Sequence, residues 1–202
     1  MCGIVGIFNL NKETVYFNQI KKMTDVIKHR GPDDEGYFID RFMGIGHRRL
    51  SIIDLSNKGH QPMDSMNKRF IISYNGEVYN YLEIKKILQK KGYIFKSNTD
   101  TEVVLNSWQE WGQKCVSKFN GMFAFSIWDK RNQTLFLVRD RYGIKPLYYA
   151  QWGDTFLFGS ELKAIKEHPD FTVITWGERP ERFDKGQIRV DSFWKEYVLV
   201  TH

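Results

Sequence analysis

The chain contains little cysteine and no long apolar run. Two of its 202 residues are cysteine, and neither belongs to a Cys-x-x-Cys spacing. A disulfide framework is therefore excluded, and a reducing compartment is expected. The apolar stretch over residues 2–9 is too short and too rich in glycine for a membrane span or a signal-peptide core. We expect a cytoplasmic chain that does not contact a membrane.

The sequence also lacks the patterns of metal and nucleic-acid sites. No metal-ligand spacing with acidic partners links its five histidines, and we expect no metal; they are His29, His47, His60, His168 and His202. The net charge of +6 is spread in pairs of basic residues along the chain, so nucleic-acid binding is not expected. The composition, with 42% hydrophobic and 27% charged residues, excludes disorder as the main state.

Short apolar stretches with strand patterning alternate with a few amphipathic segments. Strands are predicted over residues 3–8, 36–39, 43–47, 70–74, 77–79, 122–129, 134–138, 146–151 and 155–158. Helices are predicted over residues 18–28, 80–91 and from about 100 to 111. Consecutive strands joined by short turns, with the helices grouped in two places, predict an α+β domain of two mainly antiparallel sheets packed face to face with helices outside.

Local signals refine this prediction at three places. The Asn75-Gly76 pair predicts a turn or sharp kink between two strands. Thr99 and Glu102 have the spacing of a capping box at the start of a helix. Gly112 is a typical residue at the end of such a helix.

Cys2 follows the initiator methionine directly. Removal of Met1 would leave a residue that bears both a thiol and a free α-amine. The thiolate is a strong nucleophile, and an amine with a pKa of about 7.7–8.0 can take the thiol proton near neutral pH. On position alone, a cysteine that merely happens to be second is the favoured interpretation, so the catalytic one depends on the rest of the sequence. Cys115 has no histidine nearby in the sequence and is expected to be a buried, inert thiol.

Nine motifs, in order, carry a family resemblance. They are MCGIVGI (1–7), HRGPD (29–33), GHRRLSIID (46–54), QP (61–62), YNGEVYN (74–80), TDTEV (99–103), GMFAF (121–125), RDRYGIKPLY (139–148) and FGSELK (158–163). Together they resemble the glutaminase domain of class II glutamine amidotransferases, within the N-terminal nucleophile hydrolases, and most closely that of glutamine-hydrolysing asparagine synthetases. The resemblance covers residues 1–170 and implies a four-layer αββα sandwich.

The resemblance also implies the reaction and its catalytic residues. A Cys2 thioester would be the intermediate in hydrolysis of the L-glutamine side-chain amide to glutamate and ammonia. Attack by sulfur places negative charge on the amide oxygen, so hydrogen-bond donors must already point toward it. The resemblance assigns this role to the Asn75 side-chain amide and the Gly76 backbone N–H. A kinked backbone at the predicted turn would serve the same purpose, because it turns an N–H outward.

The resemblance further implies which residues bind glutamine. Arg49 would pair with the carboxylate, because the planar N–H donors of arginine bind a carboxylate bidentately. Asp100 would pair with the ammonium group. Glu77 resembles a second ligand of the amine, and Arg30 resembles the residue that flanks the nucleophile. The pocket wall would be formed through backbone contacts by Leu50, Ile52 and Ile53. Without the resemblance, Arg49 would be a surface strand residue and Asp100 part of a helix cap.

The resemblance stops near residue 170. Residues 172–181 match no pattern of the family, and residues 182–194 look like the strand pair that precedes a synthetase domain. The Ser-Gly-Gly-x-Asp-Ser pyrophosphate loop of that domain does not occur in the sequence. We therefore expect a glutaminase domain over 1–170 and an atypical extension over 171–202. ATP and Mg²⁺ would be needed only on a synthetase partner chain, the glutaminase domain needs no cofactor, and a homo-oligomer is compatible with these features.

Three functions fit the sequence. The first is a working glutaminase that supplies ammonia to an asparagine synthetase-like amidotransferase, whose acceptor would be ATP-activated aspartate on a separate or missing domain. The second is a non-catalytic remnant or regulatory module that docks onto a synthetase partner. The third is another amide hydrolase with an N-terminal nucleophile, against which Arg49 and Asp100 argue because together they select a free α-amino acid. The RDRYG segment over 139–143 is expected to build the sheet edge near the site.

Overall fold

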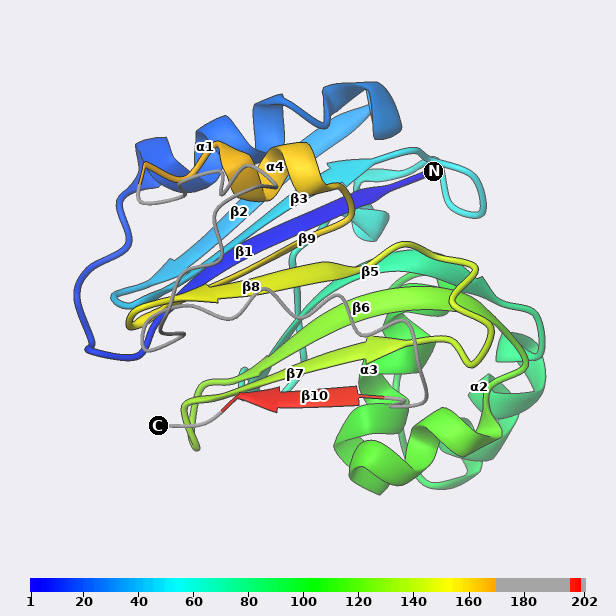
Figure 1. Cartoon of the computed structure of the whole chain (residues 1–202). Coiled ribbons are helices and arrows are strands. Elements are labelled where there is room, and N and C mark those ends of the chain that lie inside the picture. Colours follow the sequence, from blue (N-terminus) through cyan, green and yellow to red (C-terminus); the bar gives the residue numbers. More distant parts are fainter. Residues whose placement is uncertain (170–196, 201–202) are drawn as a thin grey trace.

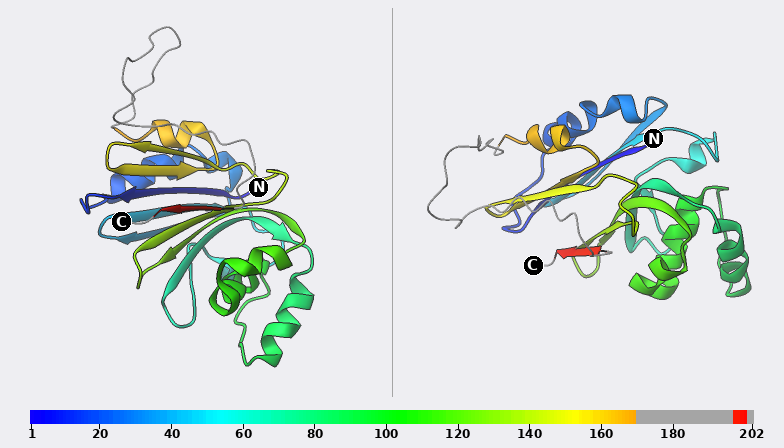
Figure 2. Two further views of the ribbon diagram at one scale, coloured as in Figure 1. Left: turned by 60° about the horizontal axis from the view of Figure 1, so that its bottom comes forward. Right: turned by 45° about the vertical axis from the view of Figure 1, so that its right-hand side comes forward.

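The computed structural model describes residues 1–169 and 197–200, which form a sandwich of two five-stranded sheets. Helices α1 and α4 cover the outer face of one sheet, and α2 and α3 cover the outer face of the other (Figure 1). Two further views show the sheets face to face between these helices (Figure 2). The predicted α+β class and the four-layer αββα arrangement are confirmed.

The first sheet has the strand order β2-β3-β1-β9-β8, and all its neighbouring strands are antiparallel. Its strands are β1 (Gly3–Asn9), β2 (Asp34–Asp40), β3 (Met43–Arg49), β8 (Tyr148–Trp152) and β9 (Thr155–Gly159). Its helices are α1 (Phe17–Asp25) and α4 (Leu162–Lys166), and a short 3₁₀ turn, η1 (Lys28–Arg30), follows α1. Ile20, Met23 and Ile27 pack at helical spacing against the outer face of β1. This sheet places Cys2 immediately before its central strand.

The second sheet has the order β10-β7-β6-β5-β4 and is also antiparallel. Its strands are β4 (Met63–Asp64), β5 (Phe70–Val78), β6 (Gly121–Asp129), β7 (Thr134–Arg139) and β10 (Tyr197–Val200). Its helical elements are η2 (Asn57–Gly59), α2 (Tyr81–Lys90), α3 (Asp100–Trp111) and η3 (Gly112–Lys118). Trp108 of α3 packs edge-on against Phe125 and Phe136 of the sheet. The helix that begins with Asp100 is thus anchored on the outer face.

The core between the sheets is aliphatic and aromatic. Phe8 of β1 meets Trp128 of β6 edge-on, with ring centroids 5.3 Å apart. Ile4 and Met43 belong to the same buried cluster. Burial of such large side chains from both inner faces is the main term that holds the two sheets together.

The predicted turn at Asn75-Gly76 was wrong. Strand β5 runs without interruption from Phe70 to Val78, with Asn75 opposite Ala124 and Gly76 opposite Phe123 of β6. A Cβ added at Gly76 would lie 2.6 Å from the carbonyl oxygen of Met122. The glycine therefore permits close approach of two strand backbones, which is another established use of glycine in sheets.

The predicted capping box is only half formed. The Thr99 hydroxyl accepts the N–H of Glu102, as expected for an N-cap. The Glu102 carboxylate instead accepts the N–H groups of Ser97, at 2.7 Å, and Lys96. Glu102 thus ties the preceding loop to the helix. The predicted helix end at Gly112 is confirmed, with φ of +58° there.

Two predictions concern the chain beyond residue 169. The boundary at residue 170 and the strand pair over 182–194 fall outside the described residues. Strand β10 is described and pairs with β7, with Tyr197 opposite Val138. Across residues 1–169 and 197–200, none of the helices has the length and apolar character needed to cross a membrane.

Candidate functional site

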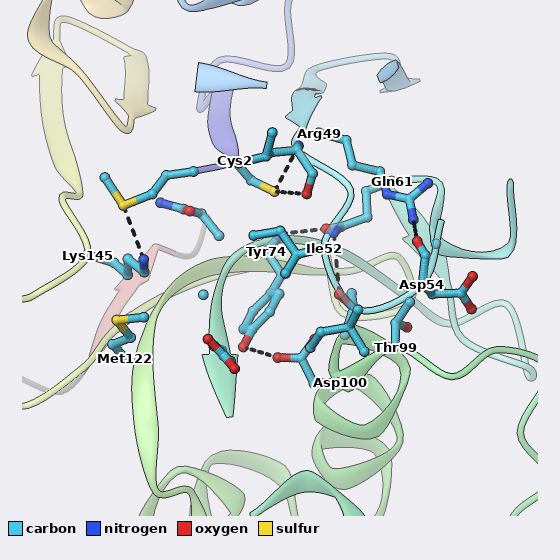
Figure 3. Close-up of a pocket in the computed structure, with 18 residues that line it drawn as sticks. Cys2, Arg49, Ile52, Asp54, Gln61, Tyr74, Thr99, Asp100, Met122 and Lys145 are labelled. Carbon is cyan, nitrogen blue, oxygen red and sulfur yellow. Dashed lines mark hydrogen bonds between the residues drawn. The ribbon is translucent and has the colours of Figure 1, made fainter. Parts of the chain in front are cut away.

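A cavity of about 200 Å³ opens where β1 begins, β3 ends and α3 begins (Figure 3). Nine of the ten predicted site residues line it, and these are Cys2, Arg49, Leu50, Ile52, Ile53, Asn75, Gly76, Glu77 and Asp100. They come from segments that are distant in the sequence, so the fold itself brings them together. The tenth, Arg30, lies outside the cavity lining.

The Cys2 thiol lies against the backbone at the end of β3. Its Sγ accepts the N–H of Leu50 at 3.4 Å and lies 3.7 Å from the carbonyl oxygen of Leu50. Burial raises the pKa of the Cys2 thiol, whereas the Leu50 N–H, the chain's terminal ammonium and the Arg49 guanidinium act in the opposite direction. The thiol therefore requires a nearby base to become a nucleophile at neutral pH.

One edge of β5 points N–H groups toward the cavity. The N–H of Tyr74 donates to the Gln61 side chain at 2.7 Å, and the N–H of Val78 donates to the Asp100 carboxylate at 3.0 Å. Because N–H directions alternate along a strand, the Gly76 N–H lies on this same edge between them. Strand β4 pairs with β5 only at Ile71 and Ile72, so this edge is open at Gly76. The Gly76 N–H thus faces the cavity.

The Asn75 side chain supplies a second donor. Asn75 is 1% exposed and lines the cavity, and its Nδ2 has no hydrogen-bond partner within the described part of the chain. Nearly all buried polar groups in native proteins are hydrogen-bonded, so an unpartnered buried donor at a cavity marks a place for a ligand acceptor. Asn75 and Gly76 therefore present two donors to one space.

Asp100 forms the opposite side of the cavity. Its Oδ2 accepts the Tyr74 hydroxyl at 2.7 Å and the N–H of Val78, and the labelled side chains of Tyr74 and Asp100 point toward each other in Figure 3. Burial raises the pKa of Asp100, while these two hydrogen bonds oppose that rise. As the first residue of α3, Asp100 also lies at the positive end of the helix dipole. A buried carboxylate beside a cavity suits a cationic ligand.

Arg49 contacts the loop that follows β3. Its Nη1 donates to the carbonyl oxygen of Ser56 at 3.0 Å, and its Nη2 donates to that of Asp54. The Asp54 carboxylate accepts N–H groups from Ser56 and Asn98, and with the Ser56 hydroxyl these bonds lower the pKa of Asp54 to about 2. Arg49 is buried at the cavity wall while the loop folds around it.

The remaining predicted residues differ in their placement. Ile52 is 70% exposed and Ile53 is also exposed, so they form the rim of the cavity, whereas Leu50 contacts the sulfur through its backbone. Glu77 is half-buried on the cavity side of β5. Arg30 lies behind Cys2 and donates from Nε to the Cys2 carbonyl oxygen at 3.0 Å. Arg30 therefore flanks the cysteine without entering the cavity.

Sequence reasoning missed several lining residues. It assigned no role to Gln61, Tyr74, Met122 or Lys145, although all four line the cavity and all four lie in motifs that carried the resemblance. The amine of Lys145 is 3.2 Å from the sulfur of Met1. The available signal was a lysine within the motif over 139–148, in the loop that leads from β7 to β8.

The loop between β7 and β8 is built by its own polar side chains. Asp140 accepts backbone N–H groups from Tyr142, Ile144 and Lys145. Arg139 donates to the carbonyl oxygens of Gly143 and Lys145. The RDRYG segment therefore shapes the sheet edge beside the cavity, as the sequence suggested. In the described ranges, no cluster of three His, Cys, Asp or Glu residues is arranged to hold a metal ion.

Comparisons with known proteins agree with this geometry. Residues 1–177 match the glutamine amidotransferase domain family. The chain is 44% identical over 173 residues to asparagine synthetase [glutamine-hydrolyzing] 3 of Bacillus subtilis, which covers 84% of this chain and 28% of that protein. It is 48% identical over 183 residues to the putative asparagine synthetase [glutamine-hydrolyzing] 2 of Methanocaldococcus jannaschii, which covers 82% of this chain and 35% of that one. The chain thus spans about a third or less of these relatives.

A solved structure shares the fold. Glutamine phosphoribosylpyrophosphate amidotransferase from B. subtilis, complexed with ADP and GMP, superposes with a TM-score of 0.70 at 21% sequence identity. The match covers 82% of this chain and 43% of the solved one. At this identity, the likeness concerns the layered architecture.

Proposed function

Because the chain belongs to the glutamine amidotransferase domain family, we propose that it hydrolyses the side-chain amide of L-glutamine, with Cys2 as the nucleophile. One observation carries this proposal. The Cys2 thiol shares a cavity with two donors at neighbouring positions, the unpartnered Asn75 amide and the Gly76 N–H. A nucleophile facing paired donors is the arrangement that acyl transfer requires.

The first step forms a thioester. After removal of Met1, the α-amine of Cys2 takes the thiol proton, and the thiolate attacks the amide carbon of glutamine so that an S–C bond forms. Negative charge develops on the amide oxygen and is stabilised by Asn75 and Gly76. One such donor typically supplies about 3–4 kcal/mol of transition-state stabilisation.

The second half of the reaction restores the thiol. The C–N bond breaks, and the nitrogen leaves as ammonia with the proton that the α-amine had taken. Water then attacks the thioester carbon while the amine accepts a proton from it. The C–S bond breaks, glutamate leaves, and the sulfur regains a proton. Water is the second reactant, and no oxidant is consumed.

Charged groups at the cavity select a free amino acid. Arg49 binds the α-carboxylate, because a guanidinium has five N–H donors and the loop carbonyls occupy two. Asp100 binds the ammonium group, and Glu77 assists it from the adjacent strand. The backbone at Leu50, Ile52 and Ile53 closes the wall. The cationic and anionic groups thus match the two ends of glutamine.

The released ammonia passes to an acceptor outside residues 1–170. The relatives named above are synthetases of which this chain spans 28–35%. We propose that the acceptor is aspartate, activated by ATP and Mg²⁺ on a synthetase domain that lies outside residues 1–202 or on a separate chain. The glutaminase domain uses no cofactor of its own.

A glutamine hydrolysis assay tests the proposal. Protein shown by intact mass to have lost Met1 is incubated with glutamine, and ammonia and glutamate are measured. Release is expected from the wild type and from Cys115→Ala, whose thiol is buried with a pKa raised to about 12. Cys2→Ala is expected to abolish release. Ammonia release that persists in Cys2→Ala would disprove the mechanism.

A further inference from the structure

A cluster of charged side chains lies behind Cys2, outside the cavity. Oε1 of Glu161 accepts hydrogen bonds from Nη1 of Arg30 at 3.0 Å and from Nε2 of His29 at 2.9 Å. Oε2 of Glu161 pairs with Lys163 at 3.1 Å. Because Arg30 also donates from Nε to the Cys2 carbonyl oxygen, Glu161 is connected to the nucleophile through one intervening side chain.

Arg30 depends on Glu161 for its position. The Arg30 side chain is 9% exposed, and its third nitrogen, Nη2, has no partner within the described residues. Glu161 is the carboxylate with which it pairs, and a buried guanidinium requires such a partner. The stem of Arg30 packs against Gly3, where an added Cβ would lie 3.3 Å from the Arg30 Cδ. The guanidinium is thus fixed against the backbone that follows Cys2.

The segment that carries Glu161 also holds the start of β1. The Ser160 hydroxyl accepts the N–H of Ile4 at 3.0 Å, and the Ser160 N–H donates to the Ile4 carbonyl at 2.9 Å. The adjacent Gly159 pairs with Val5 in the sheet. The backbone on the C-terminal side of Cys2 is therefore fixed at consecutive residues by one short segment.

We propose that Glu161 is a positioning residue for the Cys2 reaction. It holds the Arg30 guanidinium so that the Cys2 carbonyl, and with it the direction of the Cα–Cβ bond, stays aimed at the substrate amide. This inference rests on the function proposed above. The groups that bind the two ends of glutamine lie on β3 and α3, away from the cluster, so Glu161 influences turnover and leaves substrate binding unchanged.

Steady-state kinetics test this role. Misplacement of a reacting group by about 1 Å can cost about 100-fold in rate. Glu161→Ala is therefore expected to lower kcat by about 10- to 100-fold with KM for glutamine within about twofold. Glu161→Gln keeps an acceptor for Arg30 and is expected to recover most of kcat. Lys163→Met, which removes another partner of the same carboxylate, is expected to retain wild-type kcat.

Inactivation by a glutamine analogue distinguishes a positioning role of Glu161 from a general loss of structure in its variants. 6-Diazo-5-oxo-L-norleucine alkylates a correctly aimed nucleophile, so Glu161→Ala should slow its limiting inactivation rate without changing its half-saturation concentration. The double variant Arg30→Ala/Glu161→Ala should be no slower than Arg30→Ala, because both act through one contact. Should Glu161→Ala fail to fold, Glu161→Gln paired with Glu161→Leu gives the same comparison.

Three results would overturn the inference. The first is a rise in KM of Glu161→Ala by the same factor as its fall in kcat. The second is additive losses in the double variant Arg30→Ala/Glu161→Ala, and the third is a loss of kcat in Lys163→Met equal to that in Glu161→Ala. Failure of the proposed function would look different, because Cys2→Ala would then retain activity whatever the Glu161 variants did.

Discussion

At the residue scale, the buried amide of Asn75 lacks a partner and adjoins a cavity. Asn106 has the same unpartnered Nδ2 and is also buried, but it lies on α3 outside this cavity. Asn75 shares its cavity with the Cys2 thiol, whereas Asn106 lines a separate cavity beside Ser97 and Glu102. This difference provides a matched test.

Asn75→Ala is expected to lower kcat for glutamine hydrolysis by about 100- to 1,000-fold, because it removes one donor to the developing oxyanion. KM should change by a smaller factor, since the charged ends of glutamine bind elsewhere. Asn106→Ala should retain wild-type kcat in the same ammonia-release assay. A loss of activity in Asn106→Ala equal to that in Asn75→Ala would contradict the assignment.

Nine of the residues that line the cavity were anticipated because family motifs supplied them. Local physical reasoning alone assigned Arg49 to a surface strand and Asp100 to a helix cap. Both assignments describe the local structure correctly in part, since Arg49 ends β3 and Asp100 opens α3. What local reasoning could not supply is that the ends of these two elements meet, because that depends on sheet pairing between distant segments.

At the element scale, β5 carries the two proposed oxyanion donors on a regular strand. Its register with β6 brings Gly76 so close to Met122 and Phe123 that no side chain fits between the backbones. The geometry of the donors is therefore set by the whole strand pair. A turn at these positions would have been more mobile than a paired strand.

Gly76→Ala is expected to lower the free energy of unfolding by about 1–3 kcal/mol, because the new methyl group would contact Met122 O and Phe123 Cα below 3 Å. Urea denaturation followed by fluorescence would measure the change. Gly159→Ala is the control, since its added Cβ meets its neighbours at 3.5 Å and should cost less. Equal destabilisation by the two substitutions would argue against close packing at Gly76.

The elements themselves were largely predictable from periodicity. Segments 122–129 and 134–138 were expected as a hairpin and are β6 and β7, each within one residue at its ends. The Asn75-Gly76 pair failed because a dipeptide preference is weak beside pairing over nine consecutive residues. Likewise, Glu102 has nearer donors in the loop than the Thr99 N–H that the capping box specifies.

At the scale of the whole molecule, the two sheets enclose the titratable side chain of His47. His47 of β3 is fully buried and shares a 3.0 Å hydrogen bond with Ser73 of β5, across the gap between the sheets. Burial, with smaller effects from the charges of His60 and Arg49, lowers the pKa of His47 to about 3. The folded protein therefore holds this ring neutral.

The lowered pKa of His47 predicts acid sensitivity. The unfolded chain binds a proton at this histidine below pH 6.5 and the folded chain does not, so the free energy of unfolding should decrease as pH falls from 6.5. The contribution of His47 to this slope approaches about 1.4 kcal/mol per pH unit between pH 6 and 5, which lies below the pKa of 6.5 in the unfolded chain and above that in the folded chain. Urea denaturation should show this slope in the wild type and a flatter one in His47→Gln. Identical slopes would contradict the prediction.

The overall architecture was predicted from the grouping of strands and helices together with the family resemblance. The order β2-β3-β1-β9-β8 was not, because neighbours such as β1 and β9 are separated by about 150 residues and no local pattern specifies their pairing. That pairing nevertheless brings the Glu161 segment beside Cys2.

The position of Cys2 ahead of the central strand β1 has a practical consequence. Neighbouring strands flank β1 on both sides, and the sulfur already lies in the cavity. Under the proposed mechanism, an affinity tag fused to the amino end would therefore occupy the space assigned to glutamine and block the α-amine of Cys2. Purification handles, fluorophores and surface tethers would then belong at the carboxyl end, and a protease that leaves even one extra amino acid before Cys2 would be expected to yield an inactive preparation.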